Sequence, residues 1–423
     1  MNIRKIILLI SIVLVIFIVA FSAAGCCAGI SYLFRKTPKE TKANKQSDKN
    51  AAVVDKALVD SDTDFALKIF KELSDEDIDI NSNVFISPIS ISIAAAMVYN
   101  GAKNQTQEEI AQALEFTDFT PEKLNESFKT LLSSMTDIDE MVELYVGNSI
   151  WYRKDFNVEK SFMDLTKDYY DASVYDVDFT SQDTAGRINN WVSEATKNKI
   201  SKIVDQNALK DAVMYLINAI YFKGQWKDKF KEENTKEDTF YLPDNSTKKI
   251  QMMQNNEKYM YYKGADFRML RMPYGRDKTA MYILLPDENV GLDMFINGLS
   301  GDLLDKCITE ASSAEVDLKF PKFKVEYGTK SLIEPFKKLG MINSFTGKAD
   351  FSGIAPQMFI SQIDHKAVIE VNEEGTVAAA ATSIGMGATA IMPVEFIVNR
   401  PFALMIRDDR TGNILFIGKI MEP

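Results

Sequence analysis

An almost unbroken run of apolar residues extends from Ile6 to Ala24, directly after Arg4 and Lys5. Its length is roughly the 20 residues that cross the hydrocarbon core of a membrane as a helix. The pattern therefore predicts an export signal or a membrane anchor within residues 1–36, and this segment is set apart from the reasoning on the fold.

The segment that follows is polar. Residues 37–50 are rich in Lys, Thr, Asn and Gln and have no apolar periodicity. This composition predicts a flexible polar tether over residues 37–59. No internal repeat and no second linker follows, so we expect one large domain over residues 60–423.

The first part of this domain has helical patterns. Three apolar residues, Val84 to Ile86, indicate a short strand, and Ser87 is placed to cap a helix that begins at Pro88. The helix is apolar on most sides, which is typical of a buried helix. Thr106 and Glu109 have the spacing of a capping box at the start of the next helix.

The later part of the domain has strand patterns. Thr279–Leu285 is a continuous apolar run ended by Pro286, as expected of a strand covered on both faces. Two further apolar runs, Phe402–Ile406 and Ile414–Ile420, flank a polar turn at residues 408–413 and predict a buried hairpin. Because strands and helices are interspersed without a regular alternation, the fold class is predicted to be α+β.

Composition and charge exclude some classes of protein. Of the 423 residues, 46% are hydrophobic and 26% are charged, which is typical of a globular protein with a large core. The formal net charge of −11 argues against a nucleic-acid binder, because phosphates would be repelled.

Two of the three cysteines, Cys26 and Cys27, lie beside the N-terminal apolar run, and the third is in the domain. Cys307 is alone in the domain, so no disulfide is possible within it. Cys26 follows small residues in a pattern that resembles a lipoprotein cleavage site, with Cys26 as the lipidated residue, although Ala23 stands where leucine is usual. A lipid anchor, an uncleaved helix and a cleaved signal all remain open, and each predicts an extracytoplasmic domain attached to a membrane or secreted.

No catalytic motif accompanies the single histidine. His365 lies on the apolar face of an alternating strand together with Ile363 and Ala367, whereas Asp364 points to the other face. A buried, hydrogen-bonded core histidine is therefore the expected role. No metal-binding, nucleophile or phosphate-binding motif is present, so we expect neither an enzyme nor a bound cofactor or metal.

An uncharged segment follows this strand. Thr376–Val394 contains no charged residue, and its first part is rich in alanine. A core strand or a buried helix is one interpretation, but Gly385 and Gly387 and the many alanines favour neither an ordinary strand nor an anchor. The composition suits a loop that is soluble in one state and buried in another.

At this point the sequence resembles the serpins, from about Asp60 to Pro423. A run of ten residues resembles the hinge of the family: Glu373, Glu374, Gly375, Thr376, Val377, Ala378, Ala379, Ala380, Ala381 and Thr382. Four further segments resemble motifs of the family: Asn83–Ser90, Asn218–Trp226, Ala349–Ile354 and Asn399–Phe402. Val377 departs from the family, which often has glutamate there.

The resemblance implies a fold and a mechanism. The implied fold has three β-sheets, eight or nine helices and an exposed reactive-centre loop, here about residues 373–394. The implied mechanism is suicide inhibition of serine or cysteine proteases: the protease cleaves the loop, is trapped as an acyl-enzyme, and is carried along as the loop inserts into a sheet as a new strand. Alternate loop residues would then face the core: Thr376, Ala378, Ala380, Thr382, Ile384 and Met386.

The resemblance also assigns roles to single residues. Ser87, Ser90, Asn218 and His365 match a polar cluster under the central sheet, here called the shutter cluster. Trp226, Lys322 and Glu373 match the upper opening of that sheet, here called the breach, with Lys322 and Glu373 expected to form an ion pair.

The cleaved bond and the target follow from spacing within the family. Counting along the loop places the reactive bond at Thr389–Ala390 or one residue later, with Met386 as the alternative. A small side chain there implies elastase-like or subtilisin-like proteases as partners. With the net charge excluding nucleic acid, we expect a monomeric protein whose other partner is the membrane. The competing hypothesis is a non-inhibitory serpin that serves as a binding or chaperone-like module.

Overall fold

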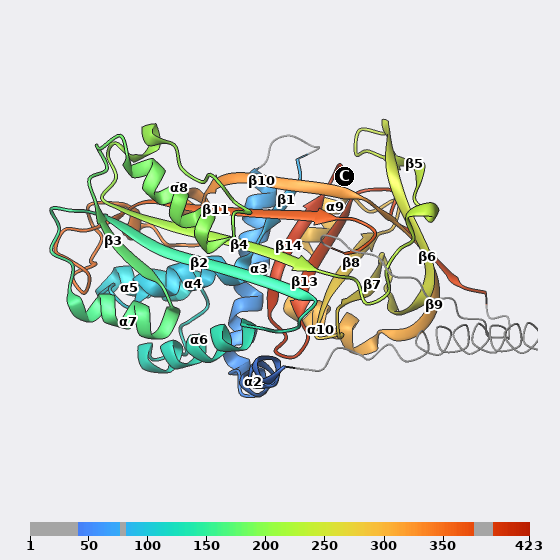
Figure 1. Ribbon diagram of the computed structural model, residues 1–423, viewed down its shortest axis with the longest axis horizontal. Helices are drawn as coiled ribbons and strands as arrows, with labels where there is room; N and C mark the ends of the chain where they lie inside the picture. Colours follow the sequence, from blue (N-terminus) through green and yellow to red (C-terminus); the bar gives the residue numbers. More distant parts are fainter. Residues whose placement is uncertain (1–40, 77–81, 376–391) are drawn as a thin grey trace, which may run out of the picture. The chain divides into compact units, whose positions relative to one another are not determined.

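Two β-sheets with helices packed against them make up the computed structural model, which describes residues 41–76, 82–375 and 392–423 (Figure 1). The mixture confirms the α+β class. The described residues contain ten α-helices rather than eight or nine: α2 Lys42–Ala51, α3 Lys56–Glu76, α4 Pro88–Tyr99, α5 Asn104–Ala113, α6 Pro121–Met135, α7 Lys160–Tyr170, α8 Thr184–Ala195, α9 Leu292–Asn297, α10 Gly301–Glu310 and α11 Ile333–Lys338.

The five-stranded sheet has the order β10-β11-β4-β2-β3. Its two central strands, β11 and β4, are parallel, whereas β10 and β2 run antiparallel to them. The long strands of this sheet lie side by side in Figure 1, and the strand bounds are β2 Val142–Arg153, β3 Ser173–Val177, β4 Met214–Gly224, β10 Phe323–Ser331 and β11 Ile360–Val371.

The other sheet has nine strands in the order β1-β14-β13-β8-β7-β6-β9-β12, with β5 paired to β6. Two of the three expected sheets are therefore continuous, because the 17-residue β6 pairs with β5, β9 and β7 along its length. The strands are β1 Val84–Ile86, β5 Lys236–Tyr241, β6 Thr247–Lys263, β7 Phe267–Tyr274, β8 Thr279–Pro286, β9 Ser312–Pro321, β12 Val394–Ile397, β13 Phe402–Asp408 and β14 Ile414–Ile420.

Helix α4 lies between the two sheets. Every residue from Pro88 to Tyr99 is buried, as the all-round apolar pattern predicts. The helix contacts β4 and β2 of one sheet and β14 of the other. Ser87 is at the N-cap position as predicted, but its hydroxyl donates to the carbonyl of Leu415 at 2.6 Å and makes no capping bond.

The predicted capping box at the next helix is wrong. Helix α5 begins at Asn104, and neither Thr106 nor Glu109 caps it. The Thr106 hydroxyl accepts from the backbone of Asp350 at 2.9 Å, and Glu109 accepts from the backbone of Asn343 at 2.7 Å. Both side chains serve a segment more than 200 residues away because the fold brings it there.

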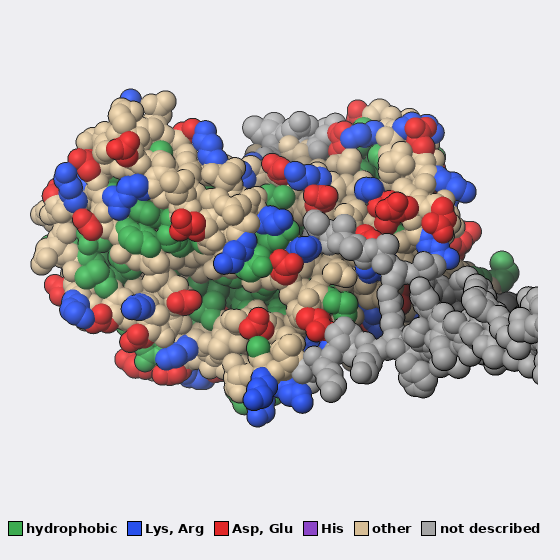
Figure 2. Space-filling view, in the orientation of Figure 1, with side chains coloured by type: hydrophobic (Ala, Val, Ile, Leu, Met, Phe, Trp, Pro, Cys, Tyr) green, Lys and Arg blue, Asp and Glu red, His purple; other side chains and the backbone are tan. Residues whose placement is uncertain are grey.

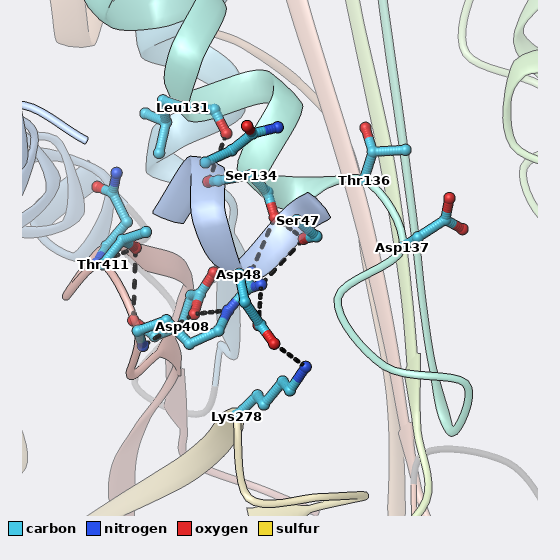
Figure 3. A network of polar contacts seen from close by, with 12 residues as sticks. Ser47, Asp48, Leu131, Ser134, Thr136, Asp137, Lys278, Asp408 and Thr411 are labelled. Atoms are coloured by element: carbon cyan, nitrogen blue, oxygen red, sulfur yellow. Dashed lines mark hydrogen bonds and ion pairs between the residues drawn. The ribbon is translucent and has the colours of Figure 1, made fainter. Parts of the chain in front are cut away.

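Within the described part of the predicted tether, residues 41–59, two helices are present instead: α2 begins at Lys42 and α3 begins at Lys56. The polar side of α2 docks through hydrogen bonds, which a search for apolar periodicity does not detect. Ser47 donates to the carbonyl of Ser134 at 2.5 Å and accepts from Arg410 at 2.9 Å, while Asp48 pairs with Lys278 at 2.6 Å (Figure 3).

Replacing Ser47 by alanine is expected to lower the free energy of unfolding by about 1 kcal/mol, because the buried carbonyl of Ser134 loses one donor. Denaturant unfolding of the two proteins measures the difference. Lys45→Ala, at an exposed position of the same helix, is the control. If both variants unfold like the unaltered protein, α2 contributes nothing through Ser47.

Charged side chains are scattered over the face drawn in Figure 2. Acidic and basic groups are intermixed over its described residues, without one continuous basic band. Within residues 41–76, 82–375 and 392–423, no helix is both long and apolar enough to cross a bilayer. The apolar run at 6–24 lies outside these ranges.

Candidate functional site

The two central strands of the five-stranded sheet separate at one end. Strands β11 and β4 pair from Ile360 with Met214 to Val368 with Tyr221. Beyond that point β11 continues to Val371 and β4 to Gly224 without pairing to each other. The sheet therefore has a split between two parallel strands, at the C-terminal end of both.

Gly375 closes the top of this split. It forms isolated antiparallel bridges with Gln225, just after β4, and with Asn372, just after β11. Its φ of +136° and the 2.2 Å that would separate an added Cβ from the carbonyl of Gly224 both require glycine here. The hinge thus begins with a tight turn from Asn372 to Gly375, and the last residue of that turn is bridged to the end of each wall.

An ion pair lies beside the bridges, as expected for the breach. The Lys322 ammonium is 2.9 Å from the Glu373 carboxylate, whose side chain is only 7% exposed. Thr235 donates to the other oxygen of Glu373 at 2.8 Å. Burial raises the pKa of the Glu373 carboxyl, but the hydrogen bond from Lys322 and further hydrogen bonds outweigh burial and hold the pKa below its usual value.

Trp226 fixes the backbone of the hinge. Its indole N–H donates to the carbonyl of Asn372 at 3.0 Å, and its backbone N–H donates to the carbonyl of Glu374 at 2.9 Å. The indole stacks on Tyr274, with ring centroids 4.4 Å apart. The structure therefore brings Trp226, Lys322 and Glu373 together as the resemblance implies.

His365 is a buried, hydrogen-bonded core residue, as its strand pattern predicts. Its Nε2 accepts from the backbone N–H of Ser87 at 3.1 Å, and its Nδ1 lies 2.6 Å from Oδ1 of Asn218. Because that amide oxygen only accepts, Nδ1 carries the proton. Burial lowers the pKa of the imidazole to about 3, so the ring is neutral near pH 7.

Asn218 connects His365 to the rest of the shutter cluster. Its amide nitrogen donates to the hydroxyl and, at 2.8 Å, to the carbonyl of Ser90, and also to Asn148 at 2.7 Å. The cluster thus ties β11 to β4 and both strands to α4, on the face of the sheet that points to the core. These bonds span the strands that loop insertion would have to part.

Other assigned residues lie outside the described ranges. They are Cys26, the hinge residues Thr376, Val377, Ala378, Ala379, Ala380, Ala381 and Thr382, and the reactive-bond residues Thr389 and Ala390. The described chain leaves the five-stranded sheet at Gly375 and resumes at Met392, just before β12 on the nine-stranded sheet. The segment between them therefore connects the two sheets.

Sequence reasoning missed two contributors to this site. Asn148 and Thr235 contact Asn218 and Glu373, from which they are 70 and 138 residues distant in sequence. Neither lies in a motif, so no local signal points to them. Within the described part of the chain, no group of three His, Cys, Asp or Glu side chains is placed to hold a metal ion.

Comparisons with known proteins agree with one another. The Serpin family model, described as serine protease inhibitor, matches residues 60–423. The leukocyte elastase inhibitor of Bos taurus is 35% identical over 377 residues, covering 86% of this chain and 98% of that protein. The crystal structure of tengpin, a thermophilic serpin in its native state, has a TM-score of 0.80 and 32% identity, covering 88% of this chain and 95% of that one. The crystal structure of human thyroxine-binding globulin in complex with thyroxine has a TM-score of 0.80 and 28% identity, covering 86% of this chain and 98% of that one.

Proposed function

Because the chain belongs to the serpin family, whose protease-inhibitor members are not enzymes, we propose that it inhibits serine endopeptidases as a suicide substrate. The loop after Gly375 is cleaved, the protease remains attached as an acyl-enzyme, and the loop inserts between β4 and β11 before the acyl bond is hydrolysed. The family's action on cysteine proteases makes these a secondary class of target.

The observation that carries this proposal is the pair of bridges at Gly375. Gly375 is bridged to the residue that follows each wall of the split, and both bridges are antiparallel. An inserting segment that continues from Gly375 thus has its register with β4 and β11 set before any protease acts. It also has two unpaired strand edges to receive it, which is the requirement for strand addition.

Continuing this register supports the role of the shutter cluster. Seven residues beyond Gly375 is Thr382, and the same distance back along each wall gives His365 and Asn218. These two residues are also opposite each other in the closed sheet. The inserting strand would therefore place the small, polar Thr382 between them, where a hydroxyl can take over their hydrogen bonds.

The target class rests on the residues around the reactive bond. We place the bond at Thr389–Ala390, or at Ala390–Ile391, with cleavage after Met386 as the alternative. The small side chains suit elastase-like or subtilisin-like proteases and not trypsin-like ones, which need Lys or Arg. A relative named as an elastase inhibitor is in line with this assignment.

The test is incubation of the purified protein with elastase, subtilisin and trypsin, followed by denaturing electrophoresis. We expect an SDS-resistant complex with the first two proteases and none with trypsin. Mass spectrometry of the released peptide locates the cleaved bond. Cleavage of the loop without any complex would overturn inhibition and favour a binding module, which the likeness to thyroxine-binding globulin makes the second candidate.

For the N-terminal segment we propose attachment of the domain to the outer side of a membrane, with Cys26 as the lipidated residue. The apolar run and the small residues before Cys26 support this. Mass spectrometry of the native protein distinguishes a lipid-modified Cys26 from an intact or a cleaved N-terminus. We further propose that the protein is a monomer, which size-exclusion chromatography in detergent tests.

A further inference from the structure

A second side-chain contact crosses the same pair of strands on the opposite face of the sheet. The hydroxyl of Tyr215, on β4, donates to the carboxylate of Asp364, on β11. Asp364 is the neighbour of His365 in sequence and points away from it, as the strand alternation predicts. The paired part of β4 and β11, below the split, is thus bonded by side chains on both faces of the sheet.

Both members of this pair are buried. Tyr215 is fully buried, and Asp364 is 5% exposed. The tyrosine belongs to the second hydrophobic cluster, in which Ile188 and Val192 of α8 pack on the five-stranded sheet. Tyr215 therefore lies in an apolar layer with residues of α8, and Asp364 is buried beside it, where a carboxylate without a hydrogen-bond donor is costly.

The remaining partners of Asp364 do not replace Tyr215. Gln362, on the same strand, donates to the other carboxylate oxygen at 2.7 Å. A cavity of about 470 Å³ adjoins the pair, and Lys202, Asp205 and Lys366 line it together with Gln362, Tyr215 and Asp364. Lys366 itself donates to the carbonyl of Lys202 at 3.1 Å.

The pKa of Asp364 agrees with this environment. Burial raises the pKa of its carboxyl above the usual value, and the hydrogen bonds from Tyr215 and Gln362 oppose the rise. If the strands part, Tyr215 moves away with β4 and Gln362 stays with β11. The carboxylate then loses its only donor from the opposite wall among the described residues.

We propose that Tyr215 and Asp364 form an outer clasp, a pair of positioning residues that sets how readily β4 and β11 part to admit the loop. The shutter cluster holds β4 to β11 on the core face, and the outer clasp holds the same two strands together on the opposite face. This inference rests on the proposed function, since it assigns residues to the loop-insertion step. The outer clasp holds β4 to β11 in the closed sheet whether or not a protease is present.

The first experiment measures uptake of a synthetic peptide with the sequence of residues 376–388, followed by native electrophoresis. Tyr215→Phe removes the donor and keeps the ring, so the fold is retained. The free energy of a buried hydrogen bond to a charged group corresponds to a factor of about ten or more in the equilibrium between closed and parted strands. The variant is therefore expected to take up the peptide about tenfold faster. If the two residues act as one pair, the double variant Tyr215→Phe/Asp364→Val takes up the peptide more slowly than the product of the two single-variant accelerations predicts.

The matched control is Tyr282→Phe. The hydroxyl of Tyr282 also donates to an aspartate, Asp409, at 2.7 Å, and the side chain is also buried, but both residues belong to the nine-stranded sheet or its hairpin turn. This variant is expected to take up the peptide at the unaltered rate. Equal acceleration by both tyrosine variants, or none by Tyr215→Phe, would show that the outer clasp does not govern strand parting.

Hydrogen exchange separates this inference from the proposed function. Amide exchange of β4 residues should be about tenfold faster in Tyr215→Phe than in Tyr282→Phe, with no peptide or protease present. If the unaltered protein neither binds the peptide nor traps a protease, the proposed function fails and the exchange rates alone decide on the clasp. If inhibition is normal and exchange is unchanged, the clasp is refuted and the function stands.

Discussion

Thr376→Arg is expected to convert the protein from an inhibitor into a substrate of its target protease. In the register set at Gly375, Thr376 would come between Gly224 and Val371, both of which are buried. A guanidinium placed there without a partner costs several kcal/mol. Insertion then becomes slower than hydrolysis of the acyl-enzyme, so the protease is released in active form and the inhibitor is left with a cleaved loop.

The measurement is the ratio of covalent complex to cleaved inhibitor on a denaturing gel, and the number of inhibitor molecules consumed for each protease inactivated. Val377→Arg is the matched control, because Val377 would come between Lys223 and Glu370 on the partly exposed outer face. It is expected to keep the complex. Unchanged stoichiometry for Thr376→Arg would mean that inhibition does not depend on loop insertion in this register.

Asp62→Asn is expected to raise the free energy of unfolding at pH 8 by several kcal/mol. Asp62, on α3, accepts from the Ser92 hydroxyl of α4 at 2.6 Å, while its other carboxylate oxygen has no hydrogen-bond partner in the described chain. Burial raises the pKa of this carboxyl to about 7, despite the hydrogen bond from Ser92. A rise from the ordinary value of 3.8 corresponds to about 4 kcal/mol, which the neutral amide does not incur.

The effect has a defined dependence on pH. The protonated Asp62 is favoured in the folded state, so the unaltered protein loses stability as the pH rises from about 4 through about 7. His365 has the opposite effect: its folded pKa of about 3 means that stability is lost as the pH falls below the ordinary value of 6.5. Between about pH 4 and pH 6.5 the changes of stability with pH from Asp62 and His365 cancel in the unaltered protein. In Asp62→Asn only the change from His365 should remain.

Denaturant unfolding at pH 4, 6 and 8 tests this. The difference between Asp62→Asn and the unaltered protein should be small at pH 4 and largest at pH 8. Asp60→Asn, on the exposed side of the same helix, should change the free energy of unfolding by no more than about 0.5 kcal/mol at each pH. A pH-independent difference would show that the Asp62 carboxyl does not titrate in the folded protein as its burial requires.

Much of the fold is predictable from short segments. The buried helix at Pro88–Tyr99, the strand from Thr279 and the C-terminal hairpin all follow from apolar patterns, and the structure has each of them. The alternation around His365 correctly separates it from Asp364. These features depend on residues that are neighbours in sequence, and for such neighbours the side-chain period of a strand or helix decides which face is buried.

Predictions based on polar residues were less successful. Ser87, Thr106 and Glu109 have the residue types and spacing of helix caps, yet all three bind segments distant in sequence. The polar segment that becomes α2 was expected to be a tether, because hydrogen-bonding partners such as Arg410 are not visible in the local pattern. A polar side chain binds whichever partner the fold brings near, and its identity alone does not specify that partner.

The sequence by itself determined the class of fold, the uncharged loop after Gly375 and, through its motifs, the likeness to the serpins. Only the tertiary structure decided that Gly375 is bridged to both walls of a split sheet, that Thr235 supports the breach and that Tyr215 bonds to Asp364. The physical reason is distance along the chain: composition and periodicity act over one element, whereas Tyr215 and Asp364 are 149 residues apart. Their contact exists only because β4 and β11 become neighbours in the folded sheet.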